Sequence, residues 1–107
     1  MSIDIHSVEK ILRNQLKDIG YFNIKIQNEK ERSFNVIAEG AIRSIFLLVI
    51  VCLVTEHLKA LTKEEIIRVK EKASTAKKEP WAAVMKVNKK GELEGIKWTN
   101  LSTLAVA

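Results

Sequence analysis

The segment Ser44–Val54, SIFLLVIVCLV, is the least polar stretch of this sequence, because ten of its eleven residues are apolar and none is charged. It could form a membrane span, a buried helix or a β-strand covered on both faces. A membrane span needs about 20 apolar residues, so the segment is too short for one. Its five β-branched residues favour a strand over a helix. A strand that is apolar on both faces belongs at the centre of a sheet.

The sequence before this segment predicts one helix and two strands. Apolar residues recur at three- and four-residue spacing over residues 7–19, which predicts an amphipathic helix that begins with Ser7 as its N-cap. Residues 22–27 alternate between apolar and polar, and a second strand is expected over 34–38. Because the connections are short, these two strands and the apolar segment should form an antiparallel meander.

The sequence after the apolar segment predicts a second helix and two further strands. Residues 62–65, TKEE, match the capping box, in which Thr62 and Glu65 bond each other's backbone at the start of a helix. Pro80 is expected to stop this helix. Its inner stripe should consist of Ile66, Val69, Ala73 and Ala76. The strands are expected over 81–87 and 93–99.

We therefore expect one α/β (α+β) domain over residues 1–107, with the element order α-β-β-β-α-β-β and a mixed central sheet flanked by two helices. Its core should span about 7–99. The apolar tail, 100–107, could pack on the domain, extend a sheet edge or contact a partner.

Positive charge is concentrated in one region of the chain. Residues 59–90 hold ten basic and four acidic residues, a net charge of +6, whereas the remainder holds eight basic and nine acidic residues, a net charge of −1. This asymmetry permits binding to DNA or RNA, although a solvated helix face is the simpler reading. The candidate phosphate-binding residues are Lys63, Lys70, Lys77, Lys78, Lys86, Lys89 and Lys90.

The remaining composition predicts a cytoplasmic protein without membrane contact. The first residues lack the basic and apolar regions of a signal peptide. A single cysteine, Cys52, cannot form an internal disulfide and is expected to be a buried apolar residue. His6 and His57 lack partners at metal-ligand spacing, which argues against zinc, and a Cys52–His57 catalytic pair is disfavoured.

Three segments together resemble a known family. They are VEKILRNQLKDIGYFNIKIQ at 8–27, SFNVIAEG at 33–40 and TKEEIIRVKEKASTAKKEPWAAVMKV at 62–87. In order and spacing they are similar to the PD-(D/E)xK nuclease superfamily, and most to small archaeal Holliday-junction resolvases. The resemblance implies a restriction-endonuclease-like fold over most of the chain.

The resemblance also implies a Mg²⁺ site, built by an aspartate on the second strand, a Glu-x-Lys pair on the third strand and a glutamate on the first helix. Only the helix glutamate, Glu9, is present. Asn35 stands where the aspartate belongs, and apolar residues replace the pair on the third strand, with Val49, Val51 and Leu53 as the degenerate positions. We therefore expect a catalytically inactive domain that binds nucleic acid and needs no cofactor.

Two alternatives remain open. The chain could be an assembly subunit that pairs with itself or with an active nuclease through its tail. It could instead be a Mg²⁺-dependent nuclease whose site has moved to Glu9, Glu39 and Glu56. Trp81 and Trp98 could stack on bases, but packing within the domain is the more common role of such residues.

Overall fold

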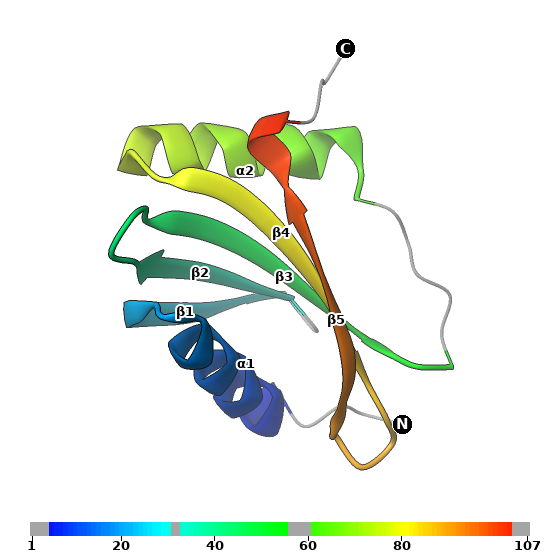
Figure 1. Ribbon diagram of the computed structural model, residues 1–107. Coiled ribbons are helices and arrows are strands. Elements are labelled where there is room, and N and C mark those ends of the chain that lie inside the picture. The colour runs from blue at the N-terminus through cyan, green and yellow to red at the C-terminus, as the bar shows by residue number, and fades with distance from the viewer. Residues whose placement is uncertain (1–4, 31–32, 56–60, 104–107) are drawn as a thin grey trace.

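A five-stranded mixed sheet in the spatial order β1-β2-β3-β4-β5 organises the chain (Figure 1). The computed structural model describes residues 5–30, 33–55 and 61–103. Their elements are α1 (Ile5–Ile19), β1 (Phe22–Lys30), β2 (Ser33–Glu39), β3 (Ile45–Leu53), α2 (Lys63–Ala76), β4 (Glu79–Val87), β5 (Leu93–Asn100) and the 3₁₀ turn η1 (Leu101–Thr103). The chain is thus an α+β structure with the predicted order of helices and strands.

The pairing of the strands follows from the length of their connections. β1, β2 and β3 form an antiparallel meander joined by short turns, as expected. β4 runs parallel to β3, because the chain crosses back through α2 before it enters the sheet again. β5 then pairs antiparallel with β4 across a short turn. Figure 1 shows α1 on one face of this sheet and α2 on the other.

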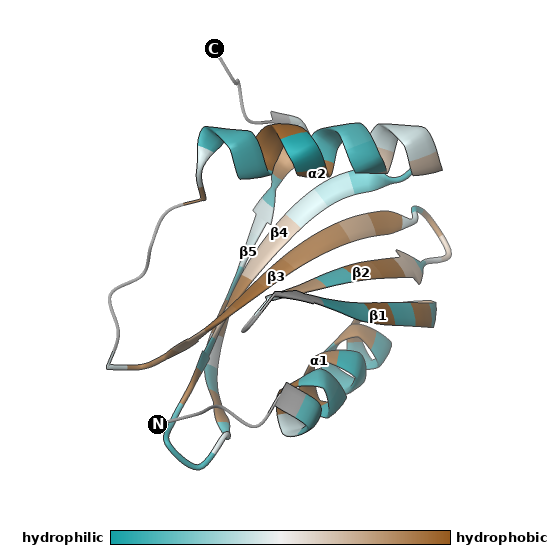
Figure 2. Ribbon diagram, turned by 180° about the vertical axis from the view of Figure 1, so that it is seen from behind, coloured by the Kyte–Doolittle hydropathy of each residue, from teal (hydrophilic) through white to brown (hydrophobic). Residues whose placement is uncertain are grey.

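The apolar strand β3 lies at the centre of the sheet, as its composition predicts (Figure 2). Its side chains divide by alternation between two apolar cores. Ile45, Leu47, Val49 and Val51 belong to the core beneath α1, whereas Phe46 and Leu48 belong to the core beneath α2. Both faces of β3 are therefore covered, which explains why its sequence shows no polar alternation.

α1 packs through Val8, Leu12 and Leu16, each of which is completely buried. The helix begins at Ile5, so the expected N-cap role of Ser7 is wrong, and Ser7 lies inside the first turn. The helix ends as predicted at Gly20, whose φ of 116° is readily accessible only to glycine. The amide N–H of Gly20 donates to the carbonyl of Leu16, and so does that of Tyr21, which satisfies the last turn.

α2 begins at the predicted capping box. The Glu65 amide donates to Thr62 Oγ1 over 3.1 Å, and the Thr62 amide donates to Glu65 Oε1 over 3.0 Å. The predicted end of this helix is wrong, because Pro80 lies inside β4 and the helix stops at Lys77, which has a left-handed φ of 59°. Ala76 was expected on the inner stripe but is exposed, whereas Val69 and Ala73 are buried.

The start of the predicted tail packs against the domain. Leu101 in η1 is completely buried in the α2 core, together with Val69, Ala73 and Ala82. Of the three roles considered for the tail, packing on the domain is therefore the one taken by Leu101. Residues 104–107 lie outside the described residues.

A polar network anchored on Glu79 ties the ends of three strands together. Its carboxylate accepts hydrogen bonds from Arg43 Nη1 at 3.0 Å, from Trp81 Nε1 at 2.9 Å and from Asn100 Nδ2 at 3.0 Å. The Glu79 amide also donates to the Ser44 carbonyl over 2.9 Å. Because the indole N–H of Trp81 is bonded here, this tryptophan has a structural role.

Candidate functional site

The register between β2 and β3 decides which residues face Asn35. Asn35 lies directly opposite Leu48, and Ser33 lies opposite Ile50. Directly opposed residues share one face of a sheet, so these four side chains lie on the α2 side. The position expected to hold a metal-binding aspartate is therefore surrounded on β3 by apolar residues.

The three β3 positions predicted to replace the catalytic pair face α1, whereas Asn35 faces α2. Val49 and Val51 are buried in the α1 core, and Leu53 packs against that core. Successive side chains of a strand point to opposite faces, so these three residues cannot converge with Asn35. The β3 residues that share the face of Asn35 are Phe46, Leu48, Ile50 and Cys52, and Leu48 is the one directly opposite Asn35.

Two of the carboxylates considered for a relocated metal site, Glu9 and Glu39, are described, and each is engaged with a different partner. Glu9 lies on α1, across the sheet from Asn35, and pairs with Arg13 at 3.8 Å. Glu39, at the end of β2, accepts a hydrogen bond from Asn23 Nδ2 at 2.9 Å. Glu56 and His57 lie outside the described residues. Within 5–30, 33–55 and 61–103, no three His, Cys, Asp or Glu side chains are grouped closely enough to hold a metal.

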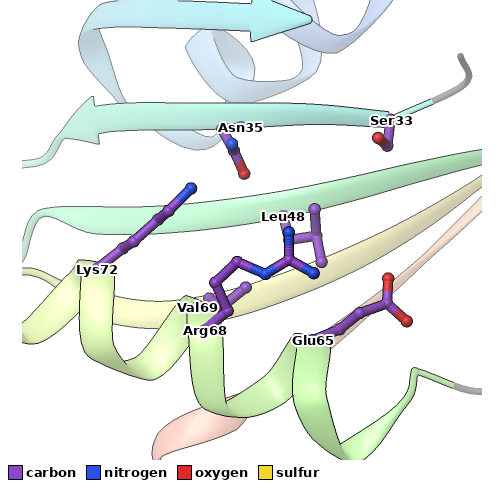
Figure 3. Close-up of a pocket in the computed structure, with 7 residues that line it drawn as sticks. All are labelled: Ser33, Asn35, Leu48, Glu65, Arg68, Val69 and Lys72. Carbon is purple, nitrogen blue, oxygen red and sulfur yellow. The ribbon is translucent and has the colours of Figure 1, made fainter. Parts of the chain in front are cut away.

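A narrow cleft lies between α2 and the β2–β3 pair, with Asn35 on its wall (Figure 3). We call it the α2–β2 cleft, and it is lined by Ser33, Asn35, Leu48, Glu65, Arg68, Val69 and Lys72. Its interior space of about 20 Å³ accommodates roughly one water-sized group. The cleft is thus a small recess with a mixed polar and apolar lining, at the face where the resemblance places metal chemistry.

The two sides of the cleft differ in charge. Arg68 and Lys72 are four residues apart on α2, so they lie on the same side of the helix. Figure 3 shows the Lys72 side chain reaching toward Asn35 on β2 and the Arg68 guanidinium extending toward Leu48 on β3. Half-buried Ser33 and Asn35 face them from β2. Leu48 and Val69, 6% and 3% exposed, contribute the apolar part of the lining. The cleft therefore places two cationic groups opposite a hydroxyl and an amide.

Glu65 also lines the cleft, but its carboxylate is already hydrogen-bonded. Its carboxylate accepts the Thr62 amide in the capping box. In Figure 3 this carboxylate lies away from Lys72 and Asn35. The Asn35–Lys72 end of the cleft is therefore the more positive end.

The sequence analysis missed Arg68, Lys72 and Ser33. A signal for the first two was present, because they immediately precede Val69 and Ala73, the buried residues of α2. Such flanking positions border the packed face of a helix, where a long side chain can reach the sheet. Ser33 carried no comparable signal, since its position depends on the β2–β3 register.

The predicted phosphate-binding lysines do not form one face. Lys63 and Lys70 lie on α2, with Lys77 and Lys78 just beyond its end. Lys86, Lys89 and Lys90 lie on β4 and in the turn to β5, which Figure 1 shows at the far end of the sheet from α2.

The β4–β5 hairpin contains acids as well as lysines. Asn88 Nδ2 donates to Glu92 and Glu94, and Asn88 Oδ1 accepts the Lys90 amide at 2.9 Å. These carboxylates offset the lysines of the turn. Residues 63–78 carry six basic and three acidic side chains, a net charge of +3, and residues 86–97 carry four basic and two acidic side chains, a net charge of +2, so the two regions differ little in net charge.

An apolar groove lies on the α1 side of the sheet. It has a volume of about 270 Å³ and is lined by Ile19, Tyr21, Ile45, Trp81 and Trp98. A second pocket, which shares Ile19 and Tyr21 with this groove, lies at the β2–β3 turn, where Ile42 is 90% exposed. Both tryptophans pack against the α1 core, so packing is part of their role.

The predictions about Cys52 and about membrane spans can be compared with the structure directly. Cys52 is buried, as predicted. In the part of the chain that the structure describes, neither helix has the length and apolar character required to cross a bilayer. Comparisons of the chain with protein-family models, with curated proteins and with solved structures found no match.

Proposed function

We propose that this chain is a restriction-endonuclease-like domain that lacks the catalytic carboxylates and binds nucleic acid through its α2 side. The α-β-β-β-α-β-β order and a mixed sheet between two helices support the fold assignment. Asn35, Leu48 and Ile50, which share one face of the β2–β3 pair, are uncharged. They offer no acidic ligands for Mg²⁺, which favours a binding role over hydrolysis.

The observation that carries this proposal is the charge of the α2–β2 cleft. Lys72 reaches toward Asn35, and Arg68 lines the same cleft, at the site where an active relative would need negative charge. Lys63, Lys70, Lys77 and Lys78 add further positive charge on or just beyond α2. Side chains of this kind bind the phosphate groups of nucleic acids in a largely sequence-independent way.

Binding should weaken steeply with salt. If about four phosphates are neutralised, the affinity for duplex DNA should fall roughly 100-fold between about 50 mM and about 200 mM salt, because counterions are released. Fluorescence anisotropy with labelled duplex, single-stranded and branched oligonucleotides measures this dependence.

A charge-matched pair of variants locates the contact surface. Lys63→Gln combined with Lys77→Gln should reduce the slope of log affinity against log salt by up to about 2. Lys10→Gln combined with Lys17→Gln removes the same charge from exposed positions of α1 and should leave the slope nearly unchanged. No binding to any of these DNAs or RNAs at low salt would contradict the proposal.

Self-association is a second candidate function, and the surface around Ile42 favours it. This exposed side chain stands beside the apolar groove formed by Tyr21, Trp81 and Trp98 with Ile19 and Ile45. A twofold dimer requires a self-complementary patch, and a projecting apolar residue next to an apolar groove meets that requirement. The occupant of the groove would be Ile42 of a second copy.

The Ile42→Glu variant tests this second candidate. If two copies pair through the groove, the substitution places a carboxylate in the apolar groove of each copy. The dissociation constant of the dimer should then rise by about 100-fold. Sedimentation equilibrium over a range of protein concentrations measures the constant. Ile67→Glu is the matched control, because Ile67 is an exposed isoleucine on α2, far from the groove. A wild-type protein that is monomeric at all concentrations would exclude the dimer.

A further inference from the structure

We infer that the α2–β2 cleft is a phosphate-binding subsite, which takes a non-bridging oxygen of a phosphate group between α2 and β2. This inference rests on the proposed function, since it specifies which chemical group of the nucleic acid that surface holds. It goes further by assigning the contact to residues that converge from two separate elements.

The donors around the cleft approach from opposite sides. Arg68 and Lys72 extend from α2, whereas Ser33 and Asn35 extend from β2 (Figure 3). A guanidinium carries five N–H donors, so Arg68 can bind an oxygen while it keeps an existing partner. An ammonium, a hydroxyl and an amide complete a set that can surround an anionic oxygen.

The size of the cleft limits what can enter. Space of about 20 Å³ admits one oxygen-sized group, so the phosphorus and its other oxygens must remain at the mouth. Arg68 and Lys72 are exposed residues of the lining, so their long side chains can bind those outer oxygens. Such a contact binds the phosphate without contacting the bases, so it carries no sequence specificity.

The apolar lining strengthens the electrostatic attraction. Leu48 and Val69 are almost completely buried and keep part of the cleft wall free of water. Charges beside such a surface interact more strongly than charges in open solvent. Lysines on the outer side of α2, such as Lys63, lack this setting, so Arg68 and Lys72 should contribute more per charge.

The charge balance favours an anion over a metal ion. Two cationic side chains oppose the entry of Mg²⁺, and Glu65 is the only carboxylate among the described residues of the lining. Because Glu65 accepts the Thr62 amide, and because it lies away from Lys72, the anion should bind at the Asn35–Lys72 end.

The Asn35→Asp variant is the sharpest test. It replaces the amide nitrogen of a half-buried side chain with an oxygen and so adds a negative charge to the cleft wall. Nucleic-acid affinity should fall about tenfold, because the new charge repels the phosphate at close range. Asn14→Asp is the matched control, since it adds the same charge at an exposed position of α1 and should change affinity less than about twofold.

A second pair of variants guards against an effect on folding. Arg68→Gln combined with Lys72→Gln alters only exposed side chains and should also reduce affinity at least about tenfold. Lys10→Gln combined with Lys17→Gln is its charge-matched control. Circular dichroism spectra and thermal unfolding confirm that all four proteins are folded.

Inorganic phosphate provides a test that does not need nucleic acid. Titration with sodium phosphate, against sodium chloride at equal ionic strength, should shift the side-chain amide resonances of Asn35 and the backbone resonance of Ser33. These shifts should be absent in the Arg68→Gln, Lys72→Gln double variant. Oligonucleotides with and without a terminal phosphate then distinguish an end-bound phosphomonoester, which gives selective binding, from an internal phosphodiester, which gives equal binding.

The outcomes separate this inference from the proposed function. Phosphate-induced shifts in the cleft, without binding of any nucleic acid, would uphold the subsite and reject the proposed function. Nucleic-acid binding that the cleft variants weaken no more than their controls would reject the subsite and uphold the proposed function.

Discussion

A Val49→Glu substitution is expected to lower the free energy of unfolding by about 3–5 kcal/mol, enough to unfold most of the protein if its stability is near the lower end of the usual range. Val49 is completely buried in the α1 core, which also contains Leu12 and Met85. No polar side chain is buried in the described residues, so a carboxylate placed there would have no partner. Chemical denaturation followed by far-ultraviolet circular dichroism measures the loss.

The neighbouring Ile50→Glu variant is the matched control. Ile50 is half-buried, and it faces the α2 side opposite Ser33. A carboxylate at this position can reach water, so the loss should be only about 1–2 kcal/mol. Equal losses in the two variants would contradict the assignment of Val49 and Ile50 to different faces. The comparison also shows which positions of β3 could accept the acidic residue of an active relative.

Removal of Leu101 is expected to have the next largest effect. Leu101→Ala should cost about 2–5 kcal/mol, because it deletes a completely buried side chain and leaves a cavity beneath α2. Urea denaturation of the full chain measures the change in the free energy of unfolding.

A pair of truncations separates Leu101 from the residues that follow it. A chain that ends at Asn100 loses Leu101, whereas a chain that ends at Thr103 retains it. The shorter chain should be less stable than the longer one by about the same 2–5 kcal/mol. If the two truncated chains unfold at the same denaturant concentration, Leu101 does not stabilise the fold as described.

These two predictions depend on features that the sequence indicated to different degrees. The burial of β3 was predictable, because an uninterrupted apolar strand is stable only when both of its faces are covered. The capping box at Thr62 and Glu65 was also predictable, because it depends on residues three positions apart. The end of α2 was not, since Pro80 appeared to be the stop and Lys77 takes the left-handed conformation instead.

The candidate site was less accessible from the sequence than the fold. Resemblance indicated Asn35 as a lost metal position, and composition indicated a basic region around α2. The sequence could not show which residues of β3 share the face of Asn35. An entirely apolar strand has no alternation of polar and apolar residues that would distinguish its two faces. For this reason the prediction that Val49, Val51 and Leu53 stand beside Asn35 was wrong.

The order of the elements and the central position of β3 were predictable from local patterns, because hydrophobic periodicity and helix caps depend on neighbouring residues. The division of β3 between two cores and the burial of Leu101 became evident from the folded chain. The tertiary structure alone brought Ser33 and Asn35 together with Arg68 and Lys72, which lie more than 30 residues further along the chain. The reason is physical: strand register and the packing of α2 against the sheet set these positions, and both arise from contacts between segments distant in sequence.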